Sequence, residues 1–211
     1  MDRLGFTALV FCRESGQAAT ELCLRQAGAT ADKLNLPSPA TCCALTFCTV
    51  GLPFIAAERT QVYFEVTIAY IGRCPQIGWA TQGFKPDGGY GVGDDSFSWG
   101  ADGIRGALWH KAKPQAWATR WKDGDVIGCA ADLEQGTVWF GCNGTWVVAF
   151  EQCAAKWKHG LRPVISGSCM AFALNKTPQF QGPRQGFYNV ASAEPLQQLD
   201  GDQAGGIFVT L

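Results

Sequence analysis

The chain has 211 residues and a formal net charge of −1, with 17 Lys plus Arg against 18 Asp plus Glu. A charge this close to zero gives no electrostatic attraction to nucleic-acid phosphates or anionic membranes, so neither is expected as a partner. Charged residues make up only 17% of the chain, below the roughly 25% usual in globular domains, which leaves neutral surface for a partner.

Residues 1–48 are interpreted as an N-terminal extension that is partly helical or disordered. Residues 17–27 form a weak helix candidate, because their apolar residues fall on one face. The apolar run 4–12 resembles a signal-peptide core, but no cleavage pattern follows it. Residues 34–57 are uncharged and long enough to span a bilayer, yet three prolines interrupt them, which favours a loop leading into a buried strand. We therefore expect a cytoplasmic protein rather than a secreted or membrane-tethered one.

Ten cysteines occur without a single C-x-x-C pair, so the spacing typical of zinc sites is missing. Cys129 and Cys142 lie in apolar runs, where a reduced thiol packs as a small hydrophobic group. Free thiols in a reducing compartment are the preferred interpretation, and neither a metal nor another cofactor is expected.

Strand patterns are strong from residue 49 onward. Apolar residues alternate with more polar ones over residues 62–68, the period of two that is typical of a half-buried strand. A shorter run of the same kind covers residues 76–80. Residues 83–106 then contain eight glycines, which predicts tight turns between short strands.

Residues 125–132 and 136–142 are predicted strands that a short turn connects. Asn143-Gly144 follows and is the strongest short hairpin signal, because both central residues of a type I′ turn need a positive φ. Residues 145–150 are the predicted partner strand.

The last strands are predicted at residues 161–166 and 169–174, joined as a hairpin across Gly167-Ser168. Residues 191–211 are interpreted as a polar C-terminal tail. Many short strands with turns between them predict an all-β sandwich or barrel.

Short motifs follow one another in a fixed order through this region. They are Val62-Tyr63-Phe64-Glu65-Val66, Gln76-Ile77-Gly78-Trp79-Ala80, Gly91-Val92-Gly93-Asp94-Asp95, Ser98-Trp99-Gly100, Asp102-Gly103 with Arg105, Trp109-His110, Gly124-Asp125-Val126-Ile127-Gly128-Cys129, Asp132-Leu133, Gly136-Thr137 with Phe140, Asn143-Gly144, Leu161-Arg162-Pro163 and Phe187. This series resembles the SPRY domain family over roughly residues 50–190, so the module is placed at 49–190. The resemblance implies a bent sandwich of two antiparallel sheets, of the concanavalin A-like jelly-roll type.

The resemblance also implies a function. SPRY domains are non-catalytic modules that bind a protein or short peptide through loops at one end of the sandwich, in ubiquitin-ligase adaptors and other scaffolds. A protein or peptide partner is therefore expected for this chain. A lectin-like domain that binds carbohydrate is the alternative, because the sandwich resembles jelly-roll lectins and aromatic side chains stack on sugars.

Aromatic and charged residues in the loops are the candidate partner-binding residues, since aromatic residues and Arg are the usual anchors of interfaces. They are Tyr90, Asp94, Arg105, Trp109, His110, Trp117 and Trp121. Arg105 is either a contact or a support of the turn at residues 94–95. Trp79, Trp99 and Trp139 fall on strand-like positions and are predicted to lie in the core.

Catalysis has little support in the sequence. Asp94 and Asp95 are a candidate metal or acid–base pair, but the further oxygen ligands that Ca²⁺ requires are missing nearby. Acceptance of backbone N–H bonds in a glycine-rich turn is the preferred interpretation of this pair. The two histidines, His110 and His159, do not accompany a nucleophile motif, so no enzymatic activity is expected.

Overall fold

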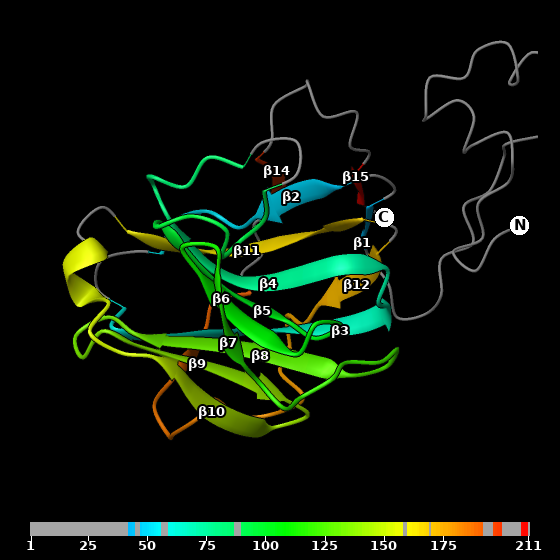
Figure 1. The fold of residues 1–211 in the computed structure, drawn as a ribbon. Coiled ribbons are helices and arrows are strands. Elements are labelled where there is room, and N and C mark those ends of the chain that lie inside the picture. Colours follow the sequence, from blue (N-terminus) through cyan, green and yellow to red (C-terminus); the bar gives the residue numbers. More distant parts are fainter. Residues whose placement is uncertain are drawn as a thin grey trace, which may run out of the picture.

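The computed structural model describes residues 42–44, 47–55, 59–86, 90–157, 160–168, 170–191, 196–199 and 208–210. In this part of the chain the fold is a sandwich of two largely antiparallel sheets, as Figure 1 shows, so the predicted all-β sandwich is confirmed. The helix candidate at 17–27 and the apolar run 4–12 lie outside the described residues. Within the described ranges, no helix has the length and apolar character needed to cross a membrane.

The first sheet has the strand order β10-β9-β8-β3-β12-β1-β15, with β13 in parallel against β3. Its strands are β1 (Cys42–Ala44), β3 (Gln61–Tyr70), β8 (Val126–Asp132), β9 (Thr137–Cys142), β10 (Thr145–Phe150), β12 (Met170–Leu174), β13 (Tyr188–Asn189) and β15 (Phe208–Thr210). Asn143 and Gly144 join β9 to β10 with φ values of 50° and 80°, which confirms the predicted hairpin turn.

The second sheet has the order β14-β2-β11-β4-β5-β6-β7. Its strands are β2 (Cys48–Gly51), β4 (Arg73–Thr81), β5 (Ser98–Asp102), β6 (Ala107–His110), β7 (Lys113–Ala116), β11 (Leu161–Ser168) and β14 (Gln197–Gln198). A 3₁₀ turn, η1 (Ala154–Lys156), lies at one end of the sandwich (Figure 1). Strands β1, β14 and β15 come from the two flanks of the chain, so pairing extends beyond residues 49–190.

The predicted hairpin between β11 and β12 is wrong. β11 pairs with β2 and β4 in the second sheet, whereas β12 pairs with β1 and β3 in the first. Both edges of β11 are therefore already occupied, and no edge is left for β12. A glycine next to a serine indicates a change of direction, but it does not indicate whether the following strand stays in the same sheet.

Apolar side chains from both sheets fill the space between them. Val62, Phe64, Val66 and Ile68 of β3 point into this core and are fully buried. Phe64 meets Trp79 of β4 edge to face, with ring centroids 4.9 Å apart. Large aromatic side chains bury about 150–250 Å² each, so such pairs contribute much of the stability of the sandwich.

The three tryptophans predicted in the core are buried, in two different places. Trp79 and Trp99 lie between the sheets, whereas Trp139 lies on the other face of the first sheet beside Tyr63. The cysteines whose side chains are described, Cys48, Cys74, Cys129, Cys142 and Cys153, are all free thiols, in agreement with their predicted reduced state.

β3 is buried on both faces, so the half-buried strand predicted from its alternation is wrong. Its other face carries Tyr63, Glu65 and Thr67, which are also buried. Residues 175–189, called here the covering segment, lie over this face. Glu65 is 1% exposed and accepts backbone N–H bonds from residues in that segment. The alternation predicts which residues share a face, but it cannot show that a segment a hundred residues later covers that face.

Candidate functional site

Four polar side chains form a row across the outer face of the second sheet. The strand register aligns Ser166 with Thr49 on one side and with Gln76 on the other, and Gln76 with Asp102. All four side chains are buried. Buried polar groups require hydrogen-bond partners, so something must cover this row and bond to it.

The cover is the loop at residues 90–95, which is hydrogen-bonded to the row. The backbone N–H of Val92 donates to Ser166 Oγ at 3.0 Å. Gln76 Nε2 donates to one carboxylate oxygen of Asp94 at 3.1 Å, and Gly91 N–H donates to the other at 2.8 Å. The loop is therefore held against the sheet by polar groups of two strands.

Hydrogen bonds from the loop and from the residues on either side of the start of β5 occupy the Asp94-Asp95 pair. Asp95 Oδ1 accepts from the backbone N–H of Phe97 at 2.9 Å and from Ser98 Oγ at 2.6 Å. Acceptance of turn hydrogen bonds, as predicted for both acids, is confirmed. Across the described residues, no group of three or more His, Cys, Asp or Glu side chains is arranged to hold a metal ion.

Tyr90 stands at the start of this loop, and 61% of the residue is exposed. On the same face, the backbone at Gly93 approaches Trp109 so closely that a Cβ at position 93 would lie 2.6 Å from the Trp109 Cβ. The Arg105 guanidinium lies over the Trp109 ring at 4.2 Å. We call Tyr90, Arg105 and Trp109 the outer-face surface.

The carboxylate partner of Arg105 is Asp102 rather than the turn at residues 94–95. Arg105 Nε donates to Asp102 Oδ2 at 2.6 Å, and its backbone N–H donates to Oδ1 at 2.7 Å. Asp102 is fully buried, whereas the Arg105 side chain is 41% exposed. Arg105 therefore balances a buried charge and also presents its guanidinium at the outer-face surface.

Trp117 and Trp121, both predicted as partner-binding residues, lie beneath the surface. Only 7% and 6% of these residues are exposed. Their rings meet edge to face at 6.1 Å, and Trp117 also lies 6.4 Å from Phe140. Trp121 covers Gly103, where any Cβ would overlap its indole ring. Their sequence neighbours suggest a loop, but the folded chain packs both side chains into the core.

His110 lies at a different place, the end of the sandwich near η1. Its ring stacks on Trp99 with centroids 4.9 Å apart and an interplanar angle of 5°. Its Nδ1 is 2.7 Å from the Ser98 carbonyl oxygen, and its Nε2 is 3.0 Å from Lys156 Nζ. A carbonyl oxygen only accepts, so Nδ1 carries the proton and Nε2 accepts from the lysine. Burial lowers the pKa of His110, and the Lys156 and Lys111 charges lower it further, which favours this neutral tautomer.

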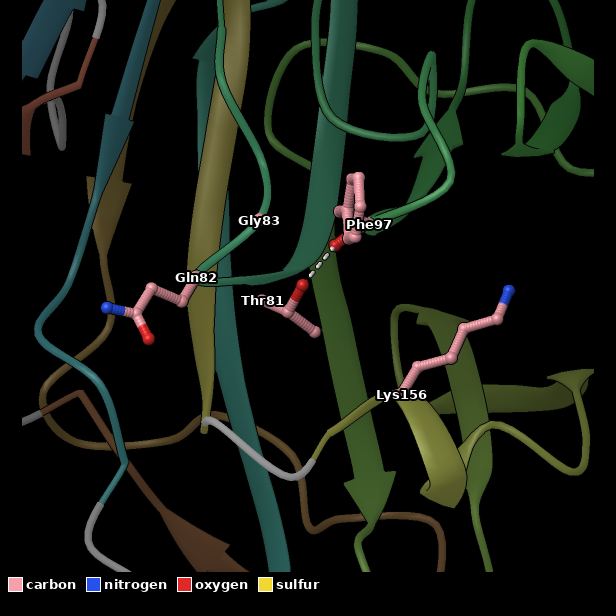
Figure 2. A pocket seen from close by; sticks show the side chains of 5 residues that line it. All are labelled: Thr81, Gln82, Gly83, Phe97 and Lys156. Atoms are coloured by element: carbon pink, nitrogen blue, oxygen red, sulfur yellow. Dashed lines mark hydrogen bonds between the residues drawn. The ribbon is translucent and has the colours of Figure 1, made fainter.

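A pocket of about 300 Å³ opens at this end of the sandwich, lined by Thr81, Gln82, Gly83, Phe97 and Lys156. Figure 2 shows the Phe97 and Lys156 side chains on one side of Thr81 and Gln82 directed to the other. Phe97 and Lys156 are not among the residues that the sequence predicts for binding. The available signal for Phe97 was a large aromatic residue between the Asp94-Asp95 turn and the next strand, and 47% of that residue is exposed.

Comparisons with known proteins agree with the architecture. The family model of the SPRY domain matches residues 61–178, more than half of the chain. The protein named E3 ubiquitin-protein ligase RKP from Arabidopsis thaliana is 37% identical over 81 residues. This match covers 38% of the present chain and 6% of that ligase, so the chain spans a small part of its curated relative.

Proposed function

The chain belongs to the SPRY domain family, and we propose that it is a non-catalytic module that binds a protein or short peptide through the outer-face surface. The observation that carries the proposal is that the loop of residues 90–95 combines a hydrogen-bonded part with an exposed aromatic side chain. The buried polar row holds Val92 and Asp94, while Tyr90, two residues before Val92, is exposed. An anchor whose backbone is already ordered loses less entropy on binding, which favours affinity.

The context proposed for this module is ubiquitination. The similar segment belongs to a protein whose name describes an E3 ubiquitin-protein ligase. In such a setting the module would select the protein to be modified and leave catalysis to other parts of the ligase.

Tyr90→Ala is expected to weaken partner binding at least about tenfold, because an exposed aromatic anchor is lost. The free energy of unfolding should change by less than about 0.5 kcal/mol, since the ring is mostly in solvent. Proteins captured from lysate on the wild type are identified, and their dissociation constants are then measured against both chains by biolayer interferometry. Tyr188→Ala, at another exposed tyrosine, is the matched control.

Two outcomes would contradict this proposal. Unchanged affinity of Tyr90→Ala for every captured partner would place recognition elsewhere on the module. Saturable binding to a glycan array, abolished by Tyr90→Ala, would instead establish the carbohydrate-binding alternative.

Gly100→Ala tests the position of the loop without removing Tyr90. A Cβ at position 100 would lie 2.2 Å from the carbonyl oxygen of Val92, a backbone atom that cannot rotate away. The loop must therefore shift, at a cost of about 1–3 kcal/mol in unfolding free energy, and binding should fall together with stability. Gly167→Ala is the control, because its nearest neighbour is the flexible Met170 thioether at 3.2 Å. Full affinity in a destabilised Gly100→Ala variant would show that the loop position is not needed for recognition.

A further inference from the structure

The pocket at the end of the sandwich is separate from the outer-face surface. Its lining comes from the end of β4, the loop before β5 and the last residue of η1. None of the lining residues belongs to the outer-face surface. A ligand here is therefore a second ligand, and the argument for it does not depend on the proposed role of Tyr90.

Lys156, which lines this pocket, is one of two neighbouring cations. Burial lowers the pKa of Lys156, and the neighbouring Lys111 ammonium lowers it further, which places the two cations close together. Among the described residues, no carboxylate forms an ion pair with either lysine. Asp95 acts on the adjacent His110, and its Oδ1 accepts from Phe97 N–H and Ser98 Oγ.

His110 fixes the position of the Lys156 ammonium. The imidazole Nε2 accepts one N–H bond from Lys156, and the ammonium also lies 5.8 Å from the centre of the Trp99 ring. The stacking of His110 on Trp99 in turn holds the imidazole in place. The lysine head group is therefore more ordered than that of an ordinary surface lysine, and less entropy is lost when an anion binds to it.

The opposite wall of the pocket is apolar. The Phe97 ring lies over Gly83, where an added Cβ would come within 2.5 Å of the ring. The absence of a side chain at Gly83 therefore leaves room for the ring there. Figure 2 shows Phe97 and Lys156 on the same side of Thr81, so an apolar ring and a lysine side chain both border the pocket.

We propose that this pocket binds an acidic segment of a protein, with a carboxylate between Lys111 and Lys156 and an adjacent apolar side chain against Phe97. Charge complementarity supports the carboxylate, and the exposed ring supports its apolar neighbour. A phosphate group is disfavoured as the ligand, because phosphate is commonly bound by the bidentate forks of Arg side chains, and no Arg is among the residues that line this pocket.

The test uses the full chain and a fluorescein-labelled peptide of alternating Phe and Glu, measured by fluorescence anisotropy. The wild type is expected to bind this peptide at least about tenfold more tightly than the matched peptide of alternating Phe and Gln. Lys111→Ala combined with Lys156→Ala should remove that preference, and Phe97→Ala should weaken binding of both peptides. Lys176→Ala is the control, because Lys176 is an exposed lysine on the covering segment.

Equal binding of the acidic and neutral peptides to the wild type would overturn the proposal, as would full affinity in the double lysine variant. Tighter binding of a matched phosphoserine peptide would also overturn it in favour of phosphate recognition. The double lysine variant is expected to have the same midpoint of urea unfolding as the wild type. A loss of peptide binding in this variant would therefore not be due to unfolding. Tyr90→Ala should keep acidic-peptide binding, which separates a failure here from a failure of the outer-face proposal.

Discussion

Glu65→Ala is expected to lower the free energy of unfolding by about 2–5 kcal/mol, because it removes the buried acceptor of two backbone N–H groups. Glu65 Oε2 accepts from Gln179 N–H at 2.7 Å, and Oε1 accepts from Phe180 N–H at 3.0 Å. These bonds fasten the covering segment to β3. Urea unfolding followed by tryptophan fluorescence measures the loss, and Glu134→Ala at an exposed turn position is the control.

Glu65→Gln separates the loss of an acceptor from the loss of charge. The amide keeps one oxygen acceptor, so this variant should lose less stability than Glu65→Ala. Equal losses for the two variants, or a loss in Glu65→Ala no larger than in Glu134→Ala, would contradict the fastening role. In that case the contacts between Trp139 and Phe187, 5.6 Å apart, would hold the covering segment instead.

The same residue gives a pH dependence with a definite sign. Burial raises the pKa of Glu65 from its usual 4.5, and the hydrogen bonds from Gln179, Phe180 and Asn175 oppose this more weakly. The folded protein therefore takes up this proton more readily than the unfolded chain. The resulting stability is present below pH 4.5 and is lost as the pH rises through the raised pKa. As the pH rises from 4.5 through the raised pKa of Glu65, the free energy of unfolding of the wild type should therefore decrease relative to that of Glu65→Gln.

Glu65 also shows where sequence reasoning about the fold stops. The motifs around β3, β4, β8 and β9 predict the sandwich, and Asn143-Gly144 predicts its tightest hairpin, because these signals are local. A glutamate in an alternating strand predicts a solvent-facing position. Its burial depends on Gln179 and Phe180, more than a hundred residues later, and no local pattern indicates that contact.

In the candidate site, too, the sequence predicts local features but not contacts between distant segments. The glycines and acids of residues 90–95 predict a turn, and the structure shows that turn with Tyr90 exposed beside it. His110 was grouped with Tyr90 because both lie in or near loops, yet the structure places it at the end of the sandwich against Trp99. The sequence does not predict Phe97 and Lys156 as site residues, because the pocket that they line forms only when residues 81–97 and residue 156 come together in the fold. Sequence proximity to a loop is therefore a poor measure of surface position.

Trp117→Ala is expected to lower the free energy of unfolding by about 3–5 kcal/mol, the cost typical of truncating a buried aromatic residue. The indole fills space between Trp121 and Phe140, so its removal leaves a cavity that the surrounding strands cannot close. Trp117→Phe keeps part of this volume and should lose clearly less. Urea unfolding of the three chains gives the comparison, with circular dichroism to confirm that each variant folds.

The measurement also decides how Trp117 relates to recognition. As a core residue, Trp117 affects binding only by destabilising the module, so the folded fraction of Trp117→Ala should bind a partner with wild-type affinity. Tyr90→Ala should give the opposite pair of results, with unchanged stability and weakened binding. If Trp117→Ala instead keeps wild-type stability and loses the partner, the indole is a contact residue that becomes exposed in the complex. A combined variant at Tyr90, Arg105 and Trp117 cannot make this distinction, because Arg105 and Trp117 both support the fold.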